Sequence, residues 1–91
     1  MYRNTYQITE DILDNLAKTG QIGTPVTNLL RQSNLSYSRL TIFVNKLTQS
    51  GLINKVDVKG KNIFIITEKG RLYLDEYKKF SSIAESFGLE L

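Results

Sequence analysis

One segment in the middle of the chain carries side chains that can recognise nucleic acid. In positions 36–49, apolar residues recur at helical spacing, and hydroxyl, amide and cationic side chains fill the positions between them. Apolar residues turned toward a core put the polar side chains on the opposite face of the helix. The core-facing residues are Leu40, Phe43, Val44 and Leu47. Hydroxyls and amides can bond to base edges, and cations can bind phosphates or guanine. The residues expected to contact DNA from this helix are Ser36, Tyr37, Ser38, Arg39, Thr41, Ile42, Asn45, Lys46 and Gln49.

Three of these residues have a second interpretation that the sequence leaves open. Ile42 points away from the core, so it either touches a thymine methyl group or is covered by another part of the chain. The ring of Tyr37 is expected to pack across the turn onto Leu29 or Leu30, with its hydroxyl free to bind a phosphate. Ser36 is expected to cap the helix first, which is compatible with phosphate binding at the same helix end.

A basic turn follows this helix. The segments 52–58 and 63–66 are predicted to be strands, and Lys59-Gly60-Lys61-Asn62 is predicted as the turn between them, with Gly60 at positive φ. Cations at such a tip suit the DNA backbone or minor groove, although lysines there also serve solubility. The adjoining helix favours the DNA role. The expected contacts from this hairpin are Lys55, Lys59, Gly60 and Lys61.

Four helical segments are predicted around these residues. Thr9, Thr24, Ser36 and Thr67 are the predicted N-caps, and Pro25 is expected to be the first helical residue after Thr24. Gly70 interrupts the last helix, which suggests that close packing near the hairpin leaves no room for a side chain. The predicted helices run over 8–19, 25 to about 32, 36 to about 50 and 68 to about 87. The order helix, helix, helix, hairpin, helix defines an α+β, mostly α fold: a winged helix-turn-helix with a two-stranded wing and a long C-terminal helix.

The last helix is longer than a core of this size needs. Aromatic and small residues recur along it at spacings of four, three, four and three, the seam of a coiled coil. We therefore expect two domains, a DNA-binding domain over 1–67 and a dimerisation helix over 68–91, and a two-fold homodimer. The expected dimer interface is Tyr73, Tyr77, Phe80, Ala84 and Phe87.

Composition limits the chemistry of the chain. The 91 residues suffice for one compact fold, and the absence of Cys and His removes thiol nucleophiles, disulfides, imidazole bases and the usual zinc sites. The net charge of +3 is unevenly distributed. Positions 24–64 hold six Lys and Arg residues and one Asp, a net charge of +5, whereas each end of the chain carries −1. The cationic excess therefore coincides with the predicted DNA-contacting elements.

Two motifs resemble those of a known family. The run "NLSYSRL" (34–40) that continues to "GLI" (51–53), and the run "ITEKGR" (66–71) that opens the last helix, are similar to small archaeal winged-helix DNA-binding proteins. The likeness extends from Ile8 to about Phe80. It implies a transcription regulator or a chromatin-type protein that dimerises through its last helix, with antiparallel pairing.

Three functions are compatible with these observations. The favoured one is a sequence-specific, dimeric transcription regulator that binds double-stranded DNA in the cytoplasm, on the nucleoid. An architectural protein of low specificity would use the same basic surface, and a protein-interaction module would offer it to an acidic partner. No enzyme activity, cofactor or metal and no association with a membrane is expected, because no catalytic constellation, phosphate-binding loop or bilayer-length apolar run occurs. The pattern names no effector ligand.

Overall fold

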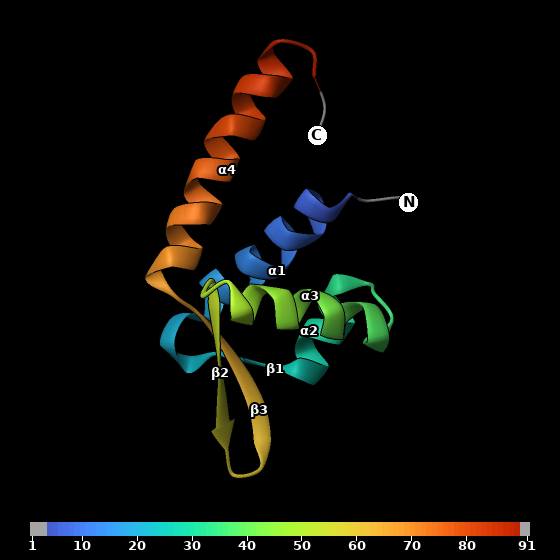
Figure 1. Cartoon of the computed structure of the whole chain (residues 1–91), viewed down its shortest axis with the longest axis vertical. Helices are drawn as coiled ribbons and strands as arrows, with labels where there is room; N and C mark the ends of the chain where they lie inside the picture. The colour runs from blue at the N-terminus through green and yellow to red at the C-terminus, as the bar shows by residue number, and fades with distance from the viewer. Residues whose placement is uncertain (1–3, 90–91) are drawn as a thin grey trace.

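The computed structural model describes residues 4–89, in which helices and a small sheet alternate (Figure 1). A long α4 rises from the body, and a hairpin projects from the opposite end (Figure 1). The elements in chain order are α1 (Thr5–Thr19), the short 3-10 helix η1 (Gly20–Ile22), β1 (Thr24–Pro25), α2 (Val26–Ser33), α3 (Tyr37–Gln49), β2 (Ile53–Val58), β3 (Lys61–Ile66) and α4 (Glu68–Ser86).

Helix α1 begins one turn earlier than the sequence predicted. Asn4 caps it: the Asn4 side chain accepts from the backbone of Gln7 at 2.8 Å, and the Gln7 side chain accepts from the backbone of Asn4 at 3.0 Å. This reciprocal capping box satisfies two N–H groups at the helix start. Thr9, the predicted cap, is instead buried inside the helix. The predicted end at Gly20 is confirmed.

Thr24 and Pro25 form a third strand, and their predicted role as the first residues of a helix was wrong. Strand β1 pairs antiparallel with β3, with Thr24 opposite Phe64, so the sheet order is β1-β3-β2. Pro25 has an extended ψ of 152° and is itself the N-cap of α2. The chain just before β1 approaches β3 closely, because a Cβ atom at Gly23 would lie 2.5 Å from the Ile63 side chain. This tertiary pairing outweighs the local preference of proline for a first helical position.

Helices α2 and α3 form the predicted helix-turn-helix. Asn34 ends α2 in the left-handed conformation, with a φ of 57°. Ser36 caps α3 as predicted, since its hydroxyl accepts from the backbone N–H of Arg39 at 3.3 Å. Two residues, Asn34 and Leu35, thus separate the last residue of α2 from the cap of α3 at Ser36. Such a tight connection fixes the direction in which α3 presents its outer face.

Strands β2 and β3 form the predicted hairpin, but its turn is tighter than the sequence indicated. Val58 pairs with Lys61, so Lys59 and Gly60 alone connect the strands, with φ values of 53° and 80°. Two successive residues at positive φ are typical of the turn that matches the twist of a hairpin. Asp57 stabilises the turn by accepting from the backbone of Gly60 at 2.9 Å. Lys61 and Asn62 therefore belong to the strand.

The start of α4 is held against the end of α3. Thr67 caps α4 as predicted by accepting from Gly70 N–H at 3.0 Å, and its hydroxyl donates to the Gly51 carbonyl at 2.7 Å. A methyl group on Gly70 would overlap the Leu52 carbonyl oxygen, so the predicted close packing is confirmed. The buried apolar core draws on all four α-helices and the sheet: Ile8, Ile12, Leu13, Leu16, Leu29, Leu40, Val44, Leu47, Leu52, Ile53, Phe64, Ile66 and Leu74.

The far half of α4 extends beyond this core. The helix ends at Ser86, with Phe87 as C-cap and Gly88 at a φ of 78°, as the sequence predicted. Its 19 residues span about 28 Å at 1.5 Å per residue. Within residues 4–89, no helix is both long and apolar enough to cross a membrane.

Candidate nucleic-acid interface

The outer face of α3 carries the polar surface that the helical pattern predicted. The residues set opposite the core stripe are exposed, and only Thr41 is half-buried. The exposed ones are Ser36, Tyr37, Ser38, Arg39, Ile42, Asn45, Lys46 and Gln49. Ile42 has 54% of its surface exposed, so no part of the described chain covers it, and it remains available to an apolar group on a partner.

Some hydroxyl groups of this face are already engaged within the chain. The Thr41 hydroxyl donates to the backbone carbonyl of Tyr37 at 2.8 Å, and the Ser36 hydroxyl is occupied as the cap of α3. These bonds stabilise the first turns of α3. Side chains with free hydrogen-bonding groups on this face are therefore fewer than the sequence suggested, and Arg39, Asn45 and Gln49 are the strongest candidates for contacts with base edges.

Tyr37 lies elsewhere than predicted. It is 63% exposed, so the expected packing of its ring onto Leu29 or Leu30 was wrong. Its side chain instead lines a small hollow of about 100 Å³ between α3 and the hairpin, together with Asn45 and Lys55. Tyr37 is therefore placed where α3 and the hairpin, the two predicted DNA-contacting elements, approach each other.

The hairpin carries the predicted cations on an exposed surface. Lys55, Lys59 and Lys61 are all exposed, as is Gly60 at the tip. A second hollow, of about 400 Å³, lies between this tip and the start of α2, lined by Lys61, Asn62 and Thr27 among others. Asn62 and Thr27 were absent from the predicted contact set. Had the two-residue turn been recognised in the sequence, Asn62 would have been predicted as a contact, because that turn places it on the strand next to Lys61.

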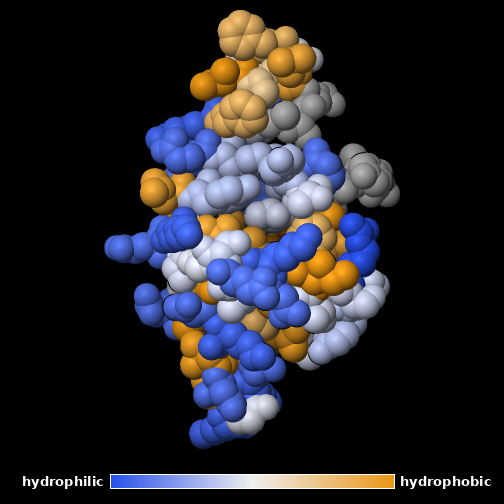
Figure 2. All heavy atoms as spheres, viewed as in Figure 1, coloured by the Kyte–Doolittle hydropathy of each residue, from blue (hydrophilic) through white to orange (hydrophobic). Residues whose placement is uncertain are grey.

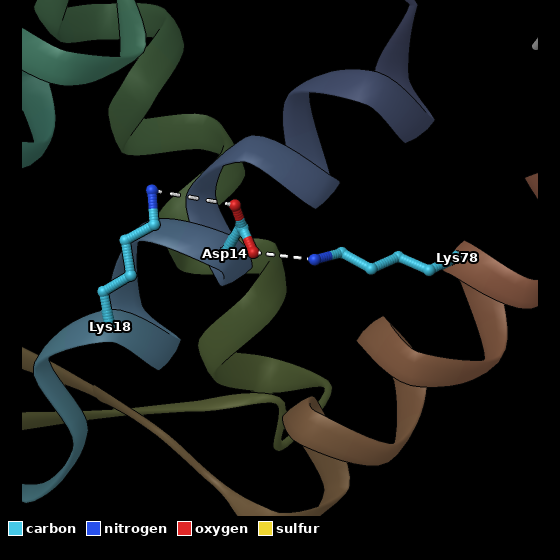
Figure 3. Close-up of polar contacts among 3 residues, drawn as sticks. All are labelled: Asp14, Lys18 and Lys78. Carbon is cyan, nitrogen blue, oxygen red and sulfur yellow. Dashed lines mark hydrogen bonds and ion pairs between the residues drawn. The ribbon is translucent and has the colours of Figure 1, made fainter.

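Opposite charges pair on α1 and α4. Asp14 on α1 lies 2.8 Å from the Lys78 amine on α4 and 4.0 Å from the Lys18 amine (Figure 3). Lys79 pairs with Glu76 at 3.4 Å. Across residues 4–89, by contrast, the five cations of α3 and the hairpin form no ion pair. These unpaired cations are Arg39, Lys46, Lys55, Lys59 and Lys61.

The predicted dimer residues of α4 divide into two groups. Tyr77 and Ala84 are buried within the chain, and Tyr73 is half-buried against the core. Phe80 and Phe87 remain 56% and 78% exposed. Ile83, which the predicted seam omitted, is 58% exposed beside them, and Figure 2 shows apolar atoms gathered over the far end of α4. Phe80, Ile83 and Phe87 form an exposed stripe. This stripe lies on a different face of α4 from the residues that pack on the rest of the chain.

A three-stranded sheet packed on a helix-turn-helix, with a projecting β2–β3 hairpin, defines the winged-helix class of proteins, in which the hairpin is the wing. The family model described as "Winged helix-turn-helix" matches residues 2–85, and the chain belongs to that family. The wing sheet has three strands where the sequence had predicted two, because β1 joins it.

The architecture is shared, along nearly the whole chain, with a solved structure. The chain is similar to Sso10a-2, a DNA-binding protein from Sulfolobus solfataricus, with a TM-score of 0.79 and 26% sequence identity over 93% of this chain and 85% of that one. The predicted resemblance to archaeal winged-helix proteins is thereby confirmed. No curated protein matches the sequence.

Proposed function

We propose that this protein binds double-stranded DNA, with α3 in the major groove and the wing along the backbone. The observation that carries the proposal is the set of unpaired cations that α3 and the wing expose on adjoining surfaces. Neutralising phosphates with such cations releases counterions and supplies affinity for any DNA sequence. The DNA-binding relative Sso10a-2 supports the proposal. DNA binding would place the protein on the nucleoid.

We further propose that it acts as a dimeric transcription regulator. Arg39, Asn45 and Gln49 would read base edges, because arginine bonds guanine and amides bond adenine in the major groove. Two copies joined through the exposed stripe of α4 would present two α3 helices to half-sites about 34 Å apart, or a multiple of that distance. The preferred sites would then be palindromic.

Selection from random duplexes tests this function directly. We expect enrichment of two related half-sites at a fixed spacing, and binding that competes poorly with unrelated DNA at the same salt concentration. Affinity for the selected site should exceed affinity for unrelated DNA by at least about a thousandfold, the lower end of the range for specific DNA-binding proteins. Failure to bind any duplex in a salt-dependent way would refute the proposal and favour a protein partner.

One observation supports an architectural role as the second candidate. The Ser36 and Thr41 hydroxyls are engaged within α3, so few side chains remain to discriminate bases. A protein that coats DNA needs the cations but not the base contacts. Under this alternative, selection would return no shared motif, and unrelated DNA would compete as well as any selected duplex.

The wing makes a separate prediction. Replacing Lys59 and Lys61 together with alanine should weaken binding to all DNA sequences alike and reduce the slope of log affinity against log salt by about 1–2 units, because each lysine neutralises about one phosphate. The measurement is a salt titration of binding to one duplex. A matched control, Lys18→Ala with Lys79→Ala, removes the same charge from α1 and α4 and should leave the slope unchanged. Equal slopes for wild type and the wing variant would exclude wing contact.

A further inference from the structure

An open aromatic pocket lies between helices α1 and α4, and none of its lining residues belongs to α3 or the wing. Tyr6, Tyr73, Tyr77 and Phe80 line it, and its volume is about 400 Å³. The ring centroids of Tyr6 and Tyr77 lie 6.3 Å apart with planes 17° from parallel. Those of Tyr73 and Tyr77 also lie 6.3 Å apart, with planes only 3° from parallel. Three tyrosine rings therefore stand nearly parallel, with Tyr77 in the middle.

Glu10 follows Tyr6 by one helical turn on α1, outside the four residues that line the pocket. Tyr6, Glu10 and Asp14 follow one another at intervals of four residues, so they share one face of α1. Tyr6 stacks on Tyr77, and Asp14 binds Lys78 across the same helix pair (Figure 3). Glu10 thus lies between the two contacts that join α1 to α4. Its charge also helps to raise the pKa of Tyr77, after burial, which is consistent with its proximity to that phenol.

Glu10 lacks a direct counter-ion in the described part of the chain. The Lys78 amine, the cation that acts on it, is bound to Asp14 at 2.8 Å. The Glu10 side chain forms no hydrogen bond or ion pair with any residue from 4 to 89. Burial raises its pKa, against the effect of Lys78, and the neighbouring charges of Asp11, Asp14 and Glu85 raise it further. A partly desolvated carboxylate, whose charge Lys78 offsets only in part, therefore lies one helical turn from Tyr6 in the wall of this apolar pocket.

We propose that this pocket binds a small organic cation, an alkylated or quaternary ammonium ion, with the aromatic rings around its apolar groups and Glu10 as its counter-charge. Aromatic faces attract such ions through their quadrupole, and the alkyl groups keep hydrophobic contact with the rings. Phe80 also belongs to the exposed stripe of α4, so a second copy is the competing occupant, and the test below includes it as an outcome. No residue of the pocket belongs to α3 or the wing, so the inference does not depend on DNA binding.

Choline and its neutral isostere 3,3-dimethylbutan-1-ol provide a matched pair of probes. Both are titrated into the full chain without DNA, at constant ionic strength, and followed by NMR. We expect saturable shifts of the tyrosine ring signals, an upfield shift of the choline methyl signal from the ring currents, and affinity about tenfold higher for choline than for the alcohol.

Two variants separate charge from shape. Glu10→Gln should abolish the preference for choline while the affinity for the alcohol stays unchanged, and Tyr6→Leu should weaken choline binding by removing one ring. Glu68→Gln removes the same charge from the exposed first turn of α4 and should keep the full preference. Thermal melts check that each variant folds. The proposal is overturned by equal affinities for the two probes, by the absence of saturable shifts, or by contacts from a second chain to the Tyr6 and Tyr73 rings in place of the ligand.

Discussion

Replacing Phe80 and Phe87 together with glutamate is expected to turn a dimer into a monomer and to weaken binding to a two-site DNA by about two to four orders of magnitude. The two side chains lie seven residues apart on α4, so both belong to the exposed stripe. More than half of the surface of each residue is exposed in the described chain, which is unusual for large apolar side chains. A buried glutamate without a partner would oppose association through this stripe.

The loss of DNA affinity would arise because a monomer cannot bind two half-sites at once. In a dimer, the second half-site is bound at a high effective concentration once the first is occupied, and a monomer lacks this advantage. The double variant should therefore bind a duplex with a single half-site about as well as the wild type does. Sedimentation at tens of micromolar protein measures the assembly, since an interface with a micromolar dissociation constant is largely paired at that concentration.

A matched control adds the same charge elsewhere. Gln21 and Ile22 are exposed on η1, which lies near the start of α4 and not near its far end (Figure 1), and replacing both with glutamate should leave the sedimentation unchanged. That variant would also lose some DNA affinity through long-range repulsion, but equally on one-site and two-site duplexes. A monomeric wild type under these conditions would contradict the proposed dimer, as would a dimeric Phe80→Glu, Phe87→Glu variant.

The sequence predicted those elements in which local signals and burial agree. Helix α3 has a serine cap, a regular apolar stripe and a terminal glycine, and the structure confirms its bounds and its exposed face. Strand β1 was missed because two residues carry too little pattern, and the pairing of Thr24 with Phe64 exists only once the wing is folded. The start of α1 was missed because the Asn4 capping box precedes the first apolar residue of the stripe.

The candidate site was predictable to the same extent. Exposure along α3 follows from helix geometry, so its polar face could be assigned from spacing alone. The side chain of Tyr37 could not, because its surroundings depend on how far the wing approaches the first turn of α3. On α4 one broad apolar arc serves two purposes: Tyr77 and Ala84 pack within the chain, whereas Phe80 and Phe87 stay exposed. Periodicity alone cannot divide such an arc between core and interface.

The junction between the wing and α4 makes the second large prediction. In Gly70→Ala, the new methyl group would overlap the Leu52 carbonyl oxygen and lie 2.8 Å from the Ile66 side chain. The carbonyl cannot easily withdraw, because it accepts a hydrogen bond from the Thr67 backbone at 3.1 Å. Thr67 in turn caps α4 and donates to the Gly51 carbonyl at 2.7 Å. The overlap therefore has to be relieved by moving α4 away from the base of the wing.

We expect Gly70→Ala to lower the free energy of unfolding by about 1–3 kcal/mol, the usual cost of overpacking. In a domain of this size, each kcal/mol lowers the melting midpoint by about 4–8 °C, which a calorimetric or circular-dichroism melt resolves easily. The direction of the change in stability shows whether overpacking or helix propensity dominates at position 70. Helix propensity alone favours alanine over glycine by about 1 kcal/mol, so without the close approach to Leu52 the substitution would be stabilising. Ser82→Ala, at an exposed position of the same helix, is the control and should stabilise α4 slightly or leave it unchanged. A Gly70→Ala variant that melts at or above the wild-type temperature would show that the first turn of α4 does not pack on the Leu52 carbonyl as closely as the structure has it.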